Sequence, residues 1–319
     1  MDYRTLSYPA KLDRLLEYHQ TSTRLAQTLG VSRMSVVNWR DDDARIKEEN
    51  RLKIDIAYCR AFSLAEVSAT EVIALQKRLA DIDFGYFSLV EEHLVQEVVR
   101  QVSFGSLEVE NSSVAQATFD RTVQGAELMA DLDRRAWLEI HNQHALNQKL
   151  IHDALAGQVG TLTPANIRHW HYALMQGIRT DAGEYSRSRR LIPGTDLVLT
   201  DARDIPEEME YWCRCYQRVA SLFDIARAHA HFELIHPFGN GNGRFGRLLM
   251  AAQCLTIGLI PPLINKANKA LYYVVLEYAQ KTGNENPLAL FLGDAILALH
   301  GKLHPRRTKR PATNGTPGH

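Results

Sequence analysis

The sequence predicts an all-α protein that carries one short β-hairpin. Apolar residues recur at helical spacing through residues 63–101, and a long helix is expected between Pro206 and Ile235. Residues 177–200 form the least helical stretch, and the run from Asp196 to Thr200 within it has the composition of a strand. Helices therefore supply the predicted core, and residues 177–200 supply the hairpin.

The composition is that of a soluble globular chain. Its 319 residues are 45% hydrophobic and 23% charged, which is enough for two or three cores. The formal net charge is +0, so no overall field draws the protein to nucleic acid or to a membrane. The most apolar run, 248–264, is broken by glycine and prolines and is expected as a core helix. Four scattered cysteines fit a reduced, cytoplasmic setting.

Residues 1–62 are predicted to form a helix-turn-helix module. Gly30 permits the turn, Ser32 can cap the second helix, and Val36 faces the core. The segment resembles the helix-turn-helix domains of bacterial regulators. On the second helix, the side chains able to bond phosphates and base edges are Arg33, Ser35, Asn38 and Arg40. Acidic residues 41–43 follow directly, so two readings stay open: DNA binding by two copies, or a packing and dimerisation module.

A histidine, a glycine-rich turn and two arginines lie close together in the chain. The run is His236-Pro237-Phe238-Gly239-Asn240-Gly241-Asn242-Gly243-Arg244-Phe245-Gly246-Arg247. Residues 241–243 allow a tight turn, and the N–H groups at the start of the following helix attract phosphate oxygens. Arg244 and Arg247 fall three apart and so reach different phosphate groups. The imidazole of His236 is suited to take a proton from an attacking hydroxyl.

This run resembles the signature of the Fic family, His-Pro-Phe-x-Asp/Glu-Gly-Asn-Gly-Arg-x-x-Arg, whose members mostly transfer AMP from ATP to a protein hydroxyl. The resemblance implies that His236 is the base and that Asn242 and the turn N–H groups hold the α-phosphate. Arg244 and Arg247 would hold the β- and γ-phosphates. Asn240 stands where the family has a carboxylate ligand of Mg²⁺, so it would bind that ion more weakly.

A second resemblance lies earlier, in Ser106-Leu107-Glu108-Val109-Glu110-Asn111. Self-inhibited Fic proteins carry Ser/Thr-x-x-x-Glu-Gly/Asn. On a helix Ser106 and Glu110 share a face, and Asn111 can end that helix. By resemblance, Glu110 pairs with Arg247 and blocks productive binding of ATP. A bias of about 3 kcal/mol would lower such binding roughly a hundredfold.

The predicted hairpin corresponds to a flap that, in Fic proteins, holds the target segment by strand addition. The segment from Leu191 to Leu199 matches its place, with the flap residues Leu191, Ile192, Pro193, Leu197 and Val198. Docking of this kind uses backbone hydrogen bonds and says little about the sequence of the target. The alternative is a basic surface loop whose arginines, Arg187, Arg189 and Arg190, are solvated.

Four parts are therefore predicted: a helix-turn-helix module at 1–62, a helical connector with the inhibitory helix at 63–112, a Fic catalytic core at 113–300 and a disordered basic tail at 301–319. The predicted reaction moves AMP from ATP, with Mg²⁺, to a Tyr, Thr or Ser hydroxyl of a target protein or of the chain itself. Three alternatives stay open: a DNA-binding regulator that senses nucleotide, an enzyme that removes AMP, and transfer of another nucleotide or of a phosphoryl group.

Overall fold

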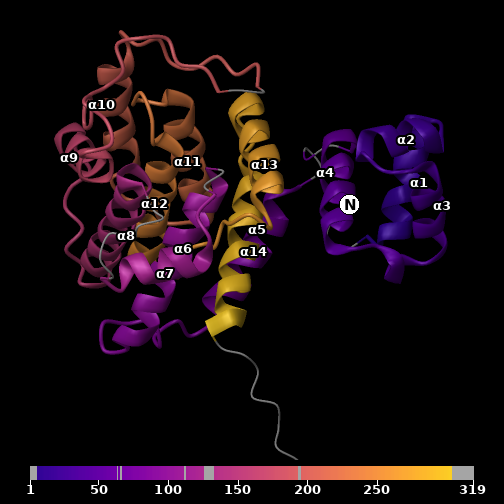
Figure 1. Ribbon diagram of the computed structural model, residues 1–319, viewed down its shortest axis with the longest axis horizontal. Coiled ribbons are helices and arrows are strands. Elements are labelled where there is room, and N and C mark those ends of the chain that lie inside the picture. The colour runs from indigo at the N-terminus through magenta and orange to yellow at the C-terminus, as the bar shows by residue number, and fades with distance from the viewer. Residues whose placement is uncertain are drawn as a thin grey trace, which may run out of the picture.

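The computed structural model describes residues 6–62, 64, 67–110, 113–125, 133–192 and 195–303. Within these ranges the chain forms α-helices and a short 3-10 helix, and no β-strand (Figure 1). The prediction of an all-α protein is therefore confirmed. Asn111, Pro193 and the tail from residue 304 onward lie outside the described ranges.

The first helices form an N-terminal lobe, residues 6–62, with a core of its own (Figure 1). They are α1 (Tyr8–His19), α2 (Ser22–Leu29), α3 (Arg33–Asp41), the 3-10 helix η1 (Asp43–Arg45) and α4 (Glu48–Ala61). Gly30 ends α2 in the left-handed region at φ 63°, where a glycine has no Cβ to strain. Ser32 caps α3 by accepting the N–H of Ser35. Leu12, Leu25 and Ile54 are fully buried between these helices.

Two helices connect the lobe to the rest of the chain. They are α5 (Ala69–Ala80) and α6 (Glu92–Val109). A reciprocal capping box between Ser68 and Glu71 begins α5. Their apolar faces share one hydrophobic cluster with later helices, in which Leu75 and Val98 are buried. The carboxyl end of α6 reaches α12, at the centre of the protein.

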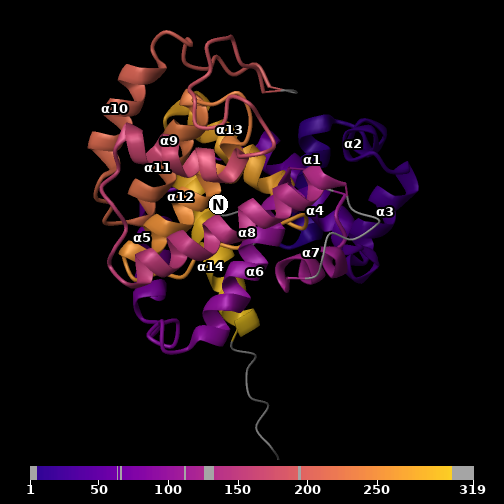
Figure 2. The same cartoon turned by 60° about the vertical axis from the view of Figure 1, so that its left-hand side comes forward.

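The central layer is built around α11 (Leu222–Ile235) and α12 (Asn242–Thr256). Around them lie α7 (Gln116–Val123), α8 (Arg134–Leu155), α9 (Pro164–Met175) and α10 (Ile205–Tyr216). α12 packs between α8 and α11, and nearly all of its side chains are buried (Figure 2). Because so buried a helix is fixed on every side, the residues at its amino end are held firmly in place.

The last two helices, α13 (Lys269–Thr282) and α14 (Asn286–Leu303), close the structure. α14 packs on α5 and α11, and α13 contacts α4 of the N-terminal lobe, so that these helices stand between the lobe and the central layer (Figure 1). None of the helices in the described part of the chain combines the length and the apolar character that a membrane span needs.

The predicted β-hairpin at 191–199 is not formed by the residues described there. Their neighbours are helices rather than a second strand: the N–H of Thr200 donates to the carbonyl of Leu234 in α11, and Asp196 pairs with Lys281 of α13. The carbonyl of Thr200 accepts a hydrogen bond from the Arg190 side chain. The N–H and the carbonyl of Thr200 are therefore bonded outside any hairpin ladder, and the strand-like composition of the segment does not supply a pairing partner.

Candidate active site

The turn between α11 and α12 gathers the predicted phosphate-binding residues. His236 ends α11 in the left-handed region, with φ 49° and ψ 57°, which is uncommon for a residue with a side chain. Asn242 closes the turn: its Oδ1 accepts the N–H of Phe238 at 2.9 Å, and its Nδ2 donates to the carbonyl of Phe238 at 2.8 Å. Both ends of the Asn242 amide are thus engaged with the backbone of Phe238, which fixes the shape of the turn.

Two glycines keep the amino end of α12 open. Gly241 is the N-cap at φ 80°, and a Cβ on it would lie 2.9 Å from the sulfur of Met175. A Cβ on Gly243 would lie 2.6 Å from Oε1 of Glu110. No side-chain hydrogen bond caps α12. Its first N–H groups and its positive dipole end therefore face a site that favours negative charge, and the Glu110 carboxylate sits against this turn.

The imidazole of His236 stands beside the turn. Its Nδ1 lies 3.3 Å from the carbonyl oxygen of Glu233. A carbonyl can only accept, so Nδ1 carries the proton and Nε2 keeps its lone pair. Burial lowers the pKa of His236 to about 4. At neutral pH the imidazole is therefore uncharged and able to accept a proton through Nε2.

A buried carboxyl group lies behind His236. Oε2 of Glu233 is 3.8 Å from Nδ1 of His236, and the Glu233 side chain is 6% exposed. Burial raises the pKa of Glu233 to about 8, although Arg247 nearby acts in the opposite direction. Gly246 leaves the room that this carboxyl group occupies, since a Cβ there would overlap Oε1. Glu233 is thus mainly protonated at neutral pH.

Arg244 is a buried guanidinium, and its relative exposure is 5%. One of its NH₂ groups donates to Oδ1 of Asn240 at 3.2 Å and approaches the sulfur of Met175 at 3.6 Å. Its Nε has no hydrogen-bond partner, and no carboxylate pairs with it within the described ranges. Burial lowers the pKa of Arg244, because the protein interior solvates the guanidinium charge less well than water does. A bound anion would provide the partner that this charge lacks.

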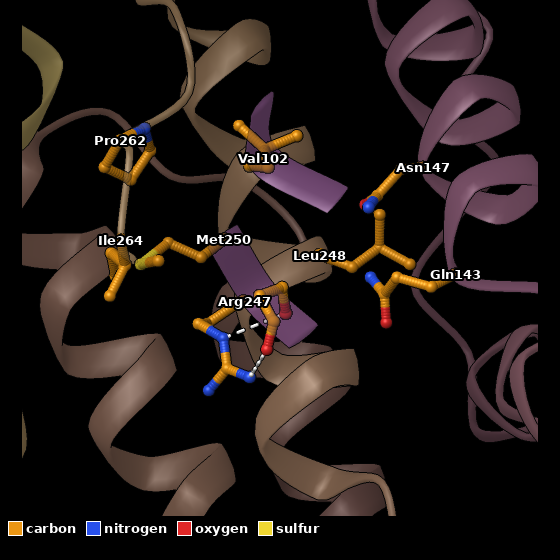
Figure 3. A pocket seen from close by; sticks show the side chains of 10 residues that line it. Val102, Gln143, Asn147, Arg247, Leu248, Met250, Pro262 and Ile264 are labelled. Carbon is orange, nitrogen blue, oxygen red and sulfur yellow. Dashed lines mark hydrogen bonds between the residues drawn. The ribbon is translucent and has the colours of Figure 1, made fainter. Parts of the chain in front are cut away.

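Arg247 is held by the end of α6. Its Nε donates to Oγ of Ser106 at 3.0 Å, and its Nη2 donates to the carbonyl of Ser106 at 3.0 Å (Figure 3). The same Nη2 lies 2.7 Å from Oε1 of Glu110. Burial alone would raise the pKa of Glu110, but the Arg247 guanidinium beside it lowers that pKa. The two side chains therefore form an ion pair at neutral pH. Val102, Leu248 and Met250 line the same cavity as Arg247 (Figure 3).

His171 of α9 is a site residue that the sequence reasoning missed. Its ring stacks on Phe238, with centroids 3.5 Å apart and planes within 2°. Its Nδ1 accepts the N–H of Gly183 at 3.0 Å, so its Nε2 donates to the carbonyl of Asn240 at 2.9 Å. Burial lowers the pKa of His171 to about 4, which keeps it in this neutral form. His171 thus fixes the turn from outside the signature, and only a histidine on a buried helical face signals it in the sequence.

Of the predicted flap residues that the structure describes, one lies at the site and the others do not. Leu191 lines a cavity that also contains His236. Ile192, Leu197 and Val198 are not among the residues that line it, and Val198 is 87% exposed.

The predicted magnesium ligand does not form a metal site by itself. Oδ1 of Asn240 already accepts from Arg244, and the described part of the chain contains no group of three His, Cys, Asp or Glu side chains arranged to hold an ion. A guanidinium next to a single amide oxygen repels a divalent cation. These residues therefore do not fit a resident Mg²⁺.

The DNA-binding candidates lie on α3 in the N-terminal lobe. Arg40 forms an ion pair with Asp13 at 2.6 Å. The hydroxyl of Ser35 lies 2.8 Å from that of Ser32, inside the cap of the helix. Arg33 is exposed, and Asn38 is partly buried. Two of the four candidate side chains are thus engaged within the lobe.

The fold and the site define a helical protein whose buried central helix begins at a glycine-rich turn without a side-chain cap. Residues 161–254 match the sequence model of the Fic/DOC family, so this chain contains a Fic/DOC domain. The match covers α9 to α12 and ends with the helix that carries Arg244 and Arg247.

Relatives and solved structures agree with this family. The protein adenylyltransferase Fic of Aedes aegypti is 34% identical over 119 residues, which is 36% of this chain and 23% of that protein. The protein of the same name from Culex quinquefasciatus is 41% identical over 69 residues, 21% of this chain and 14% of that protein. The chain thus spans about a quarter or less of the length of these relatives.

Two solved structures show the same fold. Fic-1 from C. elegans superposes with a TM-score of 0.65 at 13% identity, covering 93% of this chain and 100% of that one. A Fic domain containing signaling protein from Bacteroides thetaiotaomicron gives 0.59 at 16% identity, covering 74% and 96%. At such identities the likeness establishes the fold alone.

Proposed function

We propose that the chain is a protein adenylyltransferase that Glu110 holds inactive at rest. A hydroxyl oxygen of the target protein attacks the α-phosphorus of ATP, the bond to the β-phosphate oxygen breaks, and pyrophosphate leaves. Nε2 of His236 takes the hydroxyl proton. The product is a phosphodiester between AMP and the target side chain.

The observation that carries this proposal is the pair of buried arginines at an uncapped helix end. Arg244 and Arg247 are 5% and 6% exposed, and both follow the open turn at the start of α12. A helix N-terminus with two guanidinium groups suits a polyphosphate chain, because each phosphate gains a positive partner. The free Nε2 of His236 adds the base that a hydroxyl acceptor needs.

Inhibition is proposed to work by occupation of Arg247 and of the turn. The Glu110 carboxylate pairs with Arg247 and lies against Gly243, so close that a Cβ there would overlap it. It therefore takes the place of an anionic phosphate beside Arg247 and beside the turn. The Glu110 side chain is 38% exposed, so solvent weakens the pair and limits its strength. An ion pair of this kind can be displaced, which suits a resting state that is later released.

Magnesium is proposed to enter with the nucleotide, as part of the MgATP substrate. At the position of the family's metal ligand this chain has the amide oxygen of Asn240, which accepts a hydrogen bond from Arg244. Phosphate oxygens are the ligands that this ion prefers. The residues of this chain then contribute the positive charges of Arg244 and Arg247 and the turn N–H groups.

The experiment that tests the function follows label from α-labelled ATP into protein. The parent, Glu110→Gly, and Glu110→Gly combined with His236→Ala are compared, first on the chain itself and then on a cell extract. Label that appears with Glu110→Gly and disappears with His236→Ala supports the proposal. No label from folded Glu110→Gly protein in either sample would refute AMP transfer, and AMP released from a labelled target would indicate the reverse reaction.

A further inference from the structure

A cavity of about 580 Å³ opens beside His236. Four arginines line it, and it is called the arginine groove here: Arg179, Arg187, Arg189 and Arg190. Leu191, which is 67% exposed, lies at the same cavity. The groove therefore places positive charge and an apolar side chain next to the base that deprotonates the acceptor.

The segment that carries these arginines is fixed to the catalytic turn. The N–H of Ser186 donates to the carbonyl of Pro237 at 2.8 Å, and Tyr185 forms an isolated antiparallel bridge with Phe238. Arg190 donates to the carbonyls of Ser188 and Ile235, at 3.1 and 3.3 Å. The position of the groove relative to His236 is thus set by backbone contacts, and a bound segment would be positioned with it.

The charges of the groove do not cancel. Arg179 pairs with Asp181 at 2.6 Å, and the largely exposed Arg187 reaches Glu184 at 3.5 Å. Arg189 and Arg190 have no carboxylate partner in the part of the chain that the structure describes. Asp181 and Glu184 are the acidic residues of the lining, so the guanidinium groups outnumber them. A surplus of positive charge in a concave site attracts anionic groups.

We propose that the arginine groove binds an acidic segment of the protein that receives AMP, so that carboxylates near the acceptor hydroxyl select the target. This inference rests on the proposed function and adds the chemistry of the target. A guanidinium presents several N–H donors in a plane and pairs well with carboxylates. The exposed Leu191 gives such a segment an apolar contact beside the acceptor.

The phosphates of the nucleotide do not account for the groove. Under the proposed function the phosphates bind to Arg244, Arg247 and the start of α12, and none of these lines this cavity. The groove is instead lined by the segment from Arg179 to Leu191 and by His236 and Gly239. Its charge is therefore available to the second substrate.

The test measures peptide binding without ATP. Three fluorescein-labelled peptides of one length carry a single tyrosine flanked by glutamates, by glutamines or by lysines. The parent is compared with Arg187→Gln combined with Arg189→Gln, two exposed positions whose replacement spares the core. Arg121→Gln combined with Arg218→Gln removes the same charge from exposed positions outside the groove. Anisotropy gives Kd at low and at raised salt.

The glutamate peptide is expected to bind the parent about tenfold more tightly than the glutamine peptide at low salt. Raised salt should shrink this preference, the groove variant should lose it, and the control variant should keep it. Equal binding of the glutamate and glutamine peptides, or an unchanged preference in the groove variant, would overturn the proposal. So would tighter binding of a single-stranded oligonucleotide of matching charge.

The two proposals fail in different ways. Label transferred by Glu110→Gly protein without any acidic preference would overturn the groove and leave AMP transfer standing. An acidic preference without label would refute AMP transfer, and the groove would remain a site for acidic segments. Both readouts use the full chain.

Discussion

Nη2 of Arg247 and Oε1 of Glu110 lie 2.7 Å apart, although 137 positions separate the two residues in the sequence. The contact joins the residue that follows α6 to the helix at the centre of the protein. Its consequence under the proposed function is that the resting site already contains an anion.

Replacing Glu110 is expected to activate the protein. Glu110→Gly removes the carboxylate at a helix end where glycine is well tolerated, and AMP transfer should rise roughly ten- to hundredfold. Incorporation of α-labelled AMP measures it. Glu108→Gly serves as the matched control, because that carboxylate does not contact Arg247. An equal rise in both variants would argue for loosening of α6 rather than for release of Arg247.

The pH dependence of transfer should reflect the lowered pKa of His236. The imidazole is the base in its neutral form, so the rate should stay level through neutral pH and fall as the pH drops toward about 4. The Glu110→Gly form is used, because Glu110 itself acts to raise this pKa. A limb centred near the ordinary histidine value, about 6.5, would contradict the role of burial.

Glu233 should make the protein less stable as the pH rises. Its pKa is about 8 in the folded state, so between the ordinary glutamate value and pH 8 the unfolded chain loses a proton that the folded chain keeps. The free energy of unfolding then falls with pH, and Glu233→Gln should remove roughly 2–4 kcal/mol of that fall between pH 5 and 8. Urea unfolding measures it, with the exposed Glu184→Gln as control. Parallel pH curves for parent and variant would show that Glu233 does not titrate in this way.

His171 should stabilise the turn through its two hydrogen bonds. His171→Phe preserves stacking on Phe238 but leaves the N–H of Gly183 and the carbonyl of Asn240 without partners. A loss of about 1–3 kcal/mol of stability is expected, together with weaker ATP binding. Denaturant unfolding and nucleotide titration measure the two effects. The same change at the exposed His169 should alter neither, and a silent His171→Phe would remove the residue from the site.

A carboxylate at position 240 should strengthen the binding of magnesium at the site. Asn240→Asp places a charged oxygen beside Arg244, where it provides the ligand that the amide replaces. Half-maximal transfer should then need less Mg²⁺. If the new carboxylate only pairs with Arg244, transfer falls and its magnesium requirement does not change.

Local patterns in the sequence predict most of the helices of the fold. Helical periodicity and caps such as Ser32 and the Ser68–Glu71 box depend on neighbouring residues, and the helices they indicate are present. The hairpin predicted at 191–199 is not confirmed, because a strand needs a partner, and in the described residues Thr200 bonds to Leu234 of α11 and Asp196 pairs with Lys281 of α13. The composition of a segment does not contain that information.

The candidate site divides in the same way. The residues from His236 to Arg247 are contiguous, so their proximity follows from the sequence, whereas their roles stay predictions. His171 and Glu233 act through burial and through contacts that form only in the folded chain. The sequence predicts Asn242 as a phosphate ligand, and the structure adds that its amide closes the turn through the backbone of Phe238. Hydrogen bonds of this kind depend on three-dimensional geometry that a motif does not specify.

Ser106 gives the proposed inhibited state a further property. Its hydroxyl and its carbonyl hold Nε and Nη2 of Arg247, and neither contact involves Glu110. When the carboxylate leaves, the guanidinium therefore keeps its orientation and does not lose the rotamer entropy, up to about 2 kcal/mol, that a free arginine loses on binding. Under the proposed function, the arrangement that blocks the nucleotide thus also preorganises the side chain for it, and activation would require the departure of one carboxylate rather than the construction of a site.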